Sequence, residues 1–341
     1  MEKKYKLTDE TIGVKGKTLY RIEALKDFGE IKKGNKGGFI ESENNLAHEG
    51  NAWVSDDAWV YDNARVSGNA HVYGEAWVYG SACVYGDARV YDSTLVYDNA
   101  WVSGNAHVRG NARVYGSAHL CGNACAHGYS RVCDNTHLSD EVRVFDHACV
   151  YGDARVYDNA WVSGIARVYD HAWVSGNARV YDHAWVCGYA NVSGNARVYD
   201  HARVYDNAWV RGDACVCGNA CVSGNARVYD NARVYDHACV YGDARVYDES
   251  VIYDNAWVRG DACVCGNAKI SNKSDYIVFQ NWWSSGDYFT WTRSNNMWCT
   301  GCFYGTGDEL IKKAYKDSEL SGREYERIVK YVDEIMKDNG K

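Results

Sequence analysis

The stretch VSGNAHVYGEAWVYGSACVYGDARV, residues 66–90, runs through the same six-residue pattern four times without a gap. The pattern extends from residue 54 to residue 270, and 32 of the 37 residues numbered as multiples of six are valine. The residue two positions earlier is alanine in 32 of 37 hexads, and the residue four positions earlier is always glycine or aspartate. A repeat this short and this regular predicts a solenoid, because one unit alone buries almost nothing.

Each hexad has the side-chain alternation of a β-strand. In the segment Ala58-Trp59-Val60-Tyr61, alanine and valine point to one side while tryptophan and tyrosine point to the other. The Gly or Asp that follows tolerates a positive φ, so it suits a sharp corner. Short strands that always turn the same face inward wind around an axis. The sequence therefore predicts an all-β parallel solenoid with a narrow core of valine and alanine.

The quoted series resembles the hexapeptide-repeat, left-handed parallel β-helix proteins. That resemblance implies left-handed winding and a triangular coil of three hexads, so the 37 hexads make about 12 coils. It covers roughly residues 46–271. The fold serves acyltransferases, carbonic anhydrases, ice-binding proteins and plain scaffolds, so the resemblance predicts architecture and leaves function open.

The two flanks leave the hexad register. We expect residues 1–48 to form an N-terminal β cap over the open end of the repeat, residues 49–271 to form the β-helix, and residues 272–341 to form a small α+β domain. Both flanks resemble those of uncharacterised hexapeptide-repeat proteins from bacteria and phages. That resemblance implies no activity.

The C-terminal segment is expected to hold three strands and two helices. A Ser or Thr followed three residues later by Glu is typical of a helix start, which places one helix at Thr306 and another at Ser321. The three strands are expected at Tyr276–Asn281, Tyr288–Arg293 and Met297–Phe303.

Composition narrows the class of protein. The net charge of −8 argues against a protein that binds nucleic acid by neutralising phosphates over its whole surface. The sequence has no apolar run long enough to cross a bilayer and shows no secretory signal, so neither a membrane span nor export is expected. Its 14 cysteines then read as reduced thiols, which predicts a cytoplasmic protein.

With three hexads per coil, one outward face carries aromatic side chains in register. Such a surface suits recognition of another macromolecule, although stacked aromatics also stabilise neighbouring strands on their own. Both interpretations stay open. The candidate binding residues are aromatic side chains that we expect to be exposed, on this face and in the C-terminal segment: Trp59, Tyr61, Trp77, Tyr79, Tyr97, Tyr115, Trp282, Trp283 and Trp291.

Two groups of residues are candidates for metal or redox sites. A coil of three hexads stacks His107 over Cys125, with His127 two residues along, a donor set that zinc accepts. The spacing matches no established zinc motif, so neither a metal nor a cofactor is expected. Cys299 and Cys302 form a CxxC, which fits a redox pair, half of a zinc site or two buried thiols.

Enzymes of the resembling family project loops from their coils, and no loop interrupts these hexads. We therefore predict no catalytic residues and a non-enzymatic, rigid scaffold. Its C-terminal domain is expected to capture a protein partner, with self-association through that domain as a further expectation. One alternative is a phage- or prophage-encoded inhibitor that sequesters a component of host defence in the host cytoplasm. A second is a divergent acyltransferase.

Overall fold

The computed structural model describes residues 2–301 and 303–338. The chain divides into two compact units, Met1–Gly194 and Asn195–Lys341, which are described separately. Both contain β-solenoid, and the second also carries a small domain of four strands and two helices, so the predicted fold class is confirmed. The boundary between the units falls within the repeat. The division into cap, β-helix and C-terminal domain stays a prediction.

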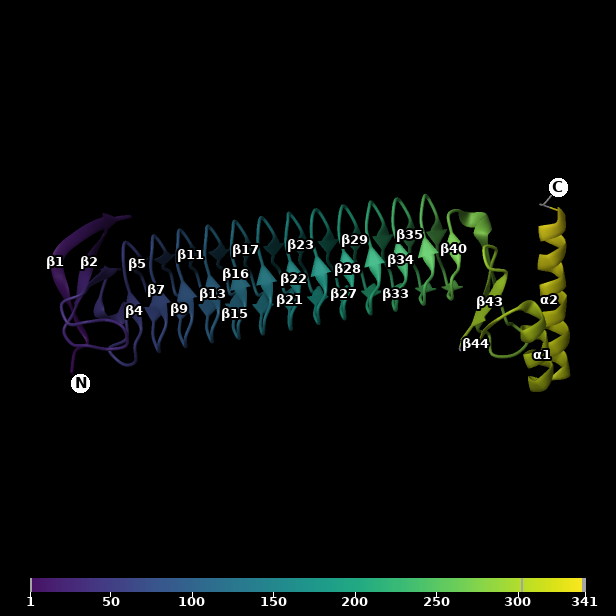
Figure 1. Cartoon of the computed structure of the whole chain (residues 1–341), viewed down its shortest axis with the longest axis horizontal. Coiled ribbons are helices and arrows are strands. Elements are labelled where there is room, and N and C mark those ends of the chain that lie inside the picture. Colours follow the sequence, from purple (N-terminus) through teal and green to yellow (C-terminus); the bar gives the residue numbers. More distant parts are fainter. Residues whose placement is uncertain (1, 302, 339–341) are drawn as a thin grey trace. The chain divides into compact units, whose positions relative to one another are not determined.

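The first unit begins with an antiparallel sheet of three strands, β1 (Tyr5–Val14), β2 (Lys17–Ala24) and β3 (Lys36–Ile40). Strand β3 then pairs in parallel with β5 (Trp59–Val60) of the repeat. The sheet therefore continues directly into one face of the solenoid, and its strands lie at the purple end of the chain in Figure 1. The short 3-10 helix η1 (Glu43–Asn45) makes the connection.

The repeat of the first unit runs from β4 (Trp53–Val54) to β27 (Asn191–Val192), as short strands of two residues that follow one another hexad by hexad. Within this unit, each strand from β4 to β24 pairs in parallel with the strand three places further on. Strand β4 pairs with β7 (His71–Val72), which places Trp53 opposite His71, three hexads further along. Figure 1 shows the resulting ladders of short arrows. The predicted coil of three hexads is confirmed.

The inside of the coil is mostly apolar and is shielded from solvent. Val84 and Val180 have no solvent exposure, and neither does Ala82. Burying a valine side chain contributes about 1.5–3 kcal/mol to the stability of the fold. A single coil buries too little to be stable alone, and stacked coils together are stable. Backbone hydrogen bonds join successive coils, as from the Arg65 N–H to the Ala82 carbonyl at 2.9 Å.

Only glycine and aspartate occur at the corners, and the backbone conformation there explains why. Both adopt the left-handed conformation, with φ of 59° at Asp62 and 69° at Gly80. A Cβ on Gly80 would lie 2.8 Å from the backbone nitrogen of Asp98 in the next coil. Asp62 accepts a hydrogen bond from the Gly80 N–H at 3.1 Å. Glycine thus allows close stacking, while aspartate supplies an acceptor for the coil that follows.

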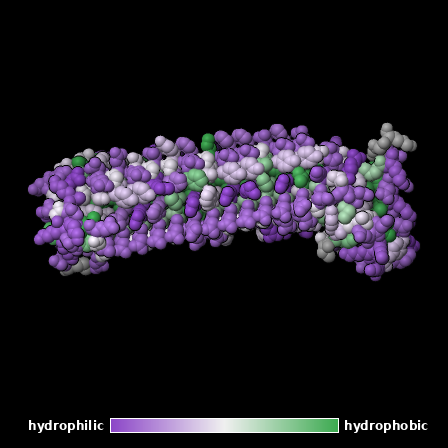
Figure 2. Space-filling model, viewed as in Figure 1, coloured by the Kyte–Doolittle hydropathy of each residue, from purple (hydrophilic) through white to green (hydrophobic). Residues whose placement is uncertain are grey.

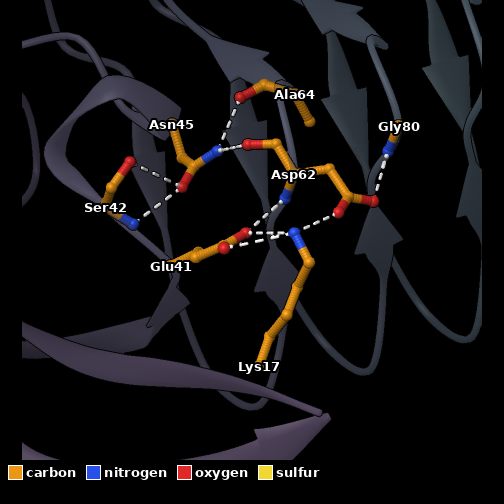
Figure 3. A network of polar contacts seen from close by, with 7 residues as sticks. All are labelled: Lys17, Glu41, Ser42, Asn45, Asp62, Ala64 and Gly80. Atoms are coloured by element: carbon orange, nitrogen blue, oxygen red, sulfur yellow. Dashed lines mark hydrogen bonds and ion pairs between the residues drawn. The ribbon is translucent and has the colours of Figure 1, made fainter. Parts of the chain in front are cut away.

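A polar network fastens the N-terminal sheet to the first coil (Figure 3). The Lys17 ammonium pairs with the carboxylates of Glu41 and Asp62, and Glu41 also accepts from the Asp62 N–H at 2.7 Å. The Asn45 amide donates to the carbonyls of Asp62 and Ala64 at 3.0 and 2.9 Å. These contacts satisfy corner groups that would otherwise face solvent at the start of the solenoid.

The second unit continues with the same repeat, from β28 (Arg197–Val198) to β40 (Lys269–Ile270), again as strands of two residues. Arg197 lies opposite Cys215, once more three hexads further along. The 3-10 helix η2 (Lys273–Asp275) ends the repeat. Among the helices of the described chain, none is both long enough and apolar enough to span a bilayer.

A small α+β domain follows, drawn in yellow-green and yellow in Figure 1. Its antiparallel sheet has the order β41-β42-β43-β44, and its two helices are adjacent in sequence. Phe289, Trp291, Trp298 and Tyr325 lie in its core. The elements are β41 (Tyr276–Gln280), β42 (Tyr288–Thr292), β43 (Met297–Thr300), β44 (Phe303–Gly305), α1 (Gly307–Asp317) and α2 (Glu319–Asp338).

Two details of this domain differ from the sequence prediction. The third strand ends at Thr300, which pairs with Phe303, because Gly301 adopts a φ of 52° and reverses the chain into a fourth strand. The Thr306 capping box is confirmed, but Ser321 lies inside α2 and does not begin it. The Ser321 N–H bonds to the Ser318 hydroxyl at 3.0 Å, so the helix starts earlier than expected.

Candidate functional site

The outward aromatic side chains of the early coils form two stacks of parallel rings, which together we call the aromatic ladder: Trp59 with Trp77, and Tyr61 with Tyr79, Tyr97 and Tyr115. Trp59 and Trp77 lie 4.5 Å apart between ring centroids, and Tyr61 and Tyr79 lie 5.1 Å apart. The stack continues to Tyr97 and Tyr115 at 5.0 and 4.9 Å. Cross-strand aromatic pairs of this kind contribute about 0.2–1 kcal/mol each. The ladder thus stabilises neighbouring coils.

The N-terminal sheet covers one end of the ladder. Tyr61 is 1% exposed and packs with Val14, Leu19 and Phe39. Burial raises the pKa of Tyr61 to about 12, and its hydroxyl has no hydrogen-bond partner within the described part of the chain. The expectation that Tyr61 is exposed is wrong, because the sequence pattern shows the outward slot but not the strands that lie over it.

Two more ladder residues are partly covered. Trp59 and Tyr79 pack against the same N-terminal cluster, and the Lys15 ammonium lies 4.9 Å from the centre of the Tyr79 ring. Trp77, Tyr97 and Tyr115 are half-buried along the solenoid. These three ladder residues lie outside the N-terminal cluster.

Next to the ladder lies a groove of about 520 Å³ that the sequence prediction missed. Its lining includes the apolar Trp77 and Leu95 and the guanidinium groups of Arg113 and Arg131, which are partners in adjacent coils. Tyr129 also lines it. The spacing of these two arginines by three hexads is visible in the sequence and could have indicated the groove. Figure 2 shows a largely hydrophilic surface with hydrophobic side chains in patches between the polar ones.

The candidate zinc residues are only partly brought together. His107 pairs with Cys125 in the adjacent coil, as expected. The ring of His127 stacks instead on Phe145, with 5.1 Å between centroids, and its burial lowers the pKa of that histidine. Within residues 2–301 and 303–338, no three His, Cys, Asp or Glu side chains are arranged to hold a metal ion.

The three candidate tryptophans of the C-terminal domain lie in three different environments. Trp282 is 74% exposed, Trp283 is half-buried, and Trp291 is 2% exposed in the domain core. The Trp291 indole N–H donates to the Asn296 side chain at 2.8 Å. The expectation that Trp291 is exposed is wrong, because it sits at an inward position of β42 within the core that the helices complete.

The exposed Trp282 stands on a well-supported turn. Its ring lies edge-on to Trp283 at 5.8 Å, and Trp283 in turn lies 5.1 Å from Tyr325 of α2. The Asn281 amide donates to the Tyr325 hydroxyl at 3.2 Å, and the Gly286 N–H closes the turn onto the Asn281 carbonyl at 2.8 Å. These contacts restrict the turn, so the Trp282 ring is exposed to solvent on a segment that retains little flexibility.

Cys302 of the CxxC lies outside the described residues. Cys299 is 2% exposed, and its sulfur lies 2.9 Å from that of Cys263 in the last coil. Cys265 and Tyr247 complete a buried cluster around it. The sequence prediction missed this cluster, since Cys263 and Cys299 are far apart in the chain and belong to different predicted domains.

The model of a repeat described as the YdcK β-solenoid repeat matches seven segments of the chain. They are residues 58–74, 64–80, 82–98, 148–164, 172–188, 196–212 and 226–240. A comparison with curated proteins finds no match.

Two acyltransferase structures are similar over part of the chain. One, described as a UDP-N-acetylglucosamine acyltransferase of Francisella novicida, is 13% identical over 55% of this chain and 60% of its own, with a TM-score of 0.21. The other, LpxA from Acinetobacter baumannii, is 11% identical over 58% of this chain and 70% of its own, with the same TM-score. This chain thus spans less than two thirds of the Francisella protein, and neither likeness bears on activity.

The repeat matches coincide with the coils of both units, and the paired strands recur every three hexads. Residue pattern, strand pairing and repeat model agree on one class. The chain is a repeat β-helix protein whose repeats are similar to the YdcK β-solenoid repeat.

Proposed function

We propose that the chain is a non-enzymatic cytoplasmic scaffold whose C-terminal domain captures a protein partner through Trp282. The observation that carries the proposal is the 74% exposure of this indole on a turn packed against Trp283 and Tyr325. Tryptophan is enriched among the residues that dominate protein interfaces, and a preorganised one loses little entropy on binding.

Other exposed apolar side chains of the same domain support a docking role. Tyr288 is an exposed residue of β42, the strand after the Trp282 turn, and Tyr331 is exposed on α2. An aromatic anchor with further apolar side chains on the same small domain is the composition of a protein interface. The proposal places no catalytic group in the repeat. Measurable binding of acetyl-coenzyme A in calorimetry would contradict that part of it.

The test compares Trp282→Ala with Trp257→Ala in the full chain. Trp257 is the matched control, because it is also exposed, at 54%, and lies on a repeat strand of the same unit. Cross-linked complexes are isolated from native cells and their partner is quantified by mass spectrometry. We expect Trp282→Ala to weaken partner binding by about 2 kcal/mol, roughly thirtyfold, and Trp257→Ala to leave it unchanged. Equal losses, or no loss at Trp282, would reject the proposed anchor.

A further inference from the structure

A cluster of three thiols and a phenol joins the last coil to the C-terminal sheet. The sulfurs of Cys263 and Cys299 are 2.9 Å apart, and the Tyr247 hydroxyl lies 2.9 Å from the Cys299 sulfur and 3.4 Å from that of Cys263. Cys265 packs in the same cluster. The three cysteines are 7%, 1% and 2% exposed in chain order, so the sulfurs meet inside the protein.

A hydrogen bond and a strand pairing hold the two cysteines in place. Cys263 belongs to β39 (Cys263–Val264), and its N–H donates to the Thr290 hydroxyl of β42 at 2.7 Å. Thr290 pairs with Cys299 across β42 and β43. The edge of the coil is thereby held against the sheet at the point where the two thiols face each other. Neither sulfur depends on a mobile loop for its position.

We propose that Cys263 and Cys299 form a reversible disulfide that locks the C-terminal sheet onto the final coil when the cell is exposed to peroxide. The bond needs the two sulfurs to approach by only about 1 Å, to the usual length of about 2.05 Å. The CxxC partner suggested by the sequence, Cys302, has no part in this bond. The proposal is independent of Trp282 and its partner.

The local charges suit Cys263 as the attacking sulfur. Hydrogen bonds from Cys265 and then Cys299 hold the pKa of the Cys263 thiol below its ordinary value, and the Arg245 guanidinium in the adjacent coil acts in the same direction. The pKa of Cys299 is raised by its hydrogen bonds and burial, so it keeps its proton. One thiolate beside one thiol is the pairing that a two-step oxidation requires.

The chemistry balances with hydrogen peroxide as the oxidant. The Cys263 thiolate attacks one peroxide oxygen, the O–O bond breaks, and the products are a sulfenic acid and hydroxide, which takes up a proton as water. The Cys299 sulfur then attacks the sulfenic sulfur. An S–S bond forms, and the hydroxyl leaves with the Cys299 proton as a second water. Two thiols are oxidised by two electrons while one peroxide is reduced to two waters.

The bond would constrain the chain between β39 and β43. Closing this loop lowers the entropy of the unfolded chain, so the oxidised protein resists unfolding of the C-terminal domain more strongly. A reducing cytoplasm would keep both thiols free at rest, and reduction by cellular thiols would reverse the lock. Oxidation thus changes how firmly the domain is held without altering its surface.

The primary test maps disulfides in the full-length protein after treatment with hydrogen peroxide and alkylation of the remaining thiols. We expect a Cys263–Cys299 cross-linked peptide in mass spectrometry, absent before oxidation and removed by dithiothreitol. Cys265→Ser and Cys302→Ser should keep the cross-link, whereas Cys263→Ser and Cys299→Ser should abolish it. No cross-link, or one that joins Cys299 to Cys265 or Cys302, would overturn the proposal.

A second readout can be taken on the wild-type protein alone, with one variant as its control. Hydrogen exchange in β41 to β44 of the wild-type protein should slow several-fold on oxidation and return with dithiothreitol. Cys299→Ser, which loses the sulfur but little volume, should show no such change. Unchanged exchange in an oxidised wild-type protein that contains the cross-link would show that the bond does not lock the sheet.

Discussion

Tryptophans in the repeat and in the C-terminal domain obey different rules. Repeat tryptophans occupy the outward slot of the hexad, and most keep solvent exposure, as do Trp101 and Trp173. In the C-terminal domain, Trp282 is exposed while Trp291 is buried, although a short sequence separates them. Where every unit is stacked on an identical one, the position within the hexad decides burial. In the C-terminal domain, where the structure does not repeat, only the tertiary contacts decide whether a tryptophan is buried.

The exception within the repeat supports this explanation. Trp53 occupies the outward slot of β4 and is still 1% exposed, because Tyr5 and Phe28 of the N-terminal segment pack against its ring. Tyr61 is covered by the N-terminal sheet in a similar way. The hexad rule therefore holds where repeat packs on repeat and fails where another element covers the coil.

A charge placed at an inward position of the hexad should lower the stability of the protein most. Val84→Asp places an unpaired carboxylate in the shielded core and should cost about 4 kcal/mol or more, because no described group inside the coil compensates the charge. Cys83→Asp, at the adjacent outward and half-buried slot, should cost far less. Chemical denaturation of both variants measures the difference. Similar losses would mean that the two slots do not differ in burial.

The next effect concerns the corners. Gly80 and Gly260 both have positive φ, 69° and 63°, but an added Cβ meets the next coil only at Gly80. Gly80→Ala should therefore cost about 1–3 kcal/mol more than Gly260→Ala, which carries the backbone strain alone. Thermal unfolding of the pair provides the measurement. A smaller loss at Gly80 would contradict close stacking at the corner.

A pH dependence tests the covered end of the aromatic ladder. Burial, and then the neighbouring Tyr79, raise the pKa of Tyr61 to about 12, whereas an unfolded tyrosine has a pKa near 10. Between these values the unfolded chain has lost a proton that the folded chain retains, so stability falls as the pH rises from 10 to 12, by about 2 kcal/mol.

The matched variants for this prediction are Tyr61→Phe and Tyr129→Phe. Denaturation at pH 8 and pH 11 should show a weaker loss of stability at high pH for Tyr61→Phe than for the wild type. Tyr129 is 58% exposed, so its variant should follow the wild type. If Tyr61→Phe follows the wild-type curve instead, the ring is not buried under the N-terminal sheet.

The smallest effect separates two serines that occupy the inward alanine slot. Ser250 donates to the Tyr247 carbonyl at 2.7 Å, whereas the buried Ser130 hydroxyl has no partner among the residues described. Ser250→Ala should lose about 1 kcal/mol, and Ser130→Ala should be neutral or gain up to about 1 kcal/mol. Urea denaturation resolves the sign. Equal changes in stability would mean that the hydrogen bond of Ser250 does not contribute to the stability of the fold.

Much of the solenoid could be predicted from the sequence because its contacts are periodic. The coil length, the inward valines and the glycine and aspartate corners all depend on neighbours that repeat the same residues. What the pattern could not show are contacts between segments of different kinds. The cover over Tyr61, the burial of Trp291 and the meeting of Cys263 with Cys299 each join a repeat or strand position to a non-periodic partner.

One surface feature was visible in the sequence and was not recognised as part of a groove. Arg113 and Arg131 fall on one column of the three-hexad coil, which the sequence alone places side by side. By contrast, the exposed indole of Trp282 depends on the support of Trp283 by Tyr325 of α2, which lies far along the chain from both tryptophans. No local pattern separates Trp282 from Trp283 in advance.

Nuclear Overhauser contacts between backbone protons show directly whether residues three hexads apart lie side by side. The amide proton of Arg65 should show cross-strand contacts to Cys83, its partner in the next coil, while the methyl groups of Val84 remain shielded from solvent. Contacts from Arg65 at any other spacing, or a Val84 side chain accessible to a water-soluble paramagnetic probe, would contradict the stacked coil on which the whole account is built.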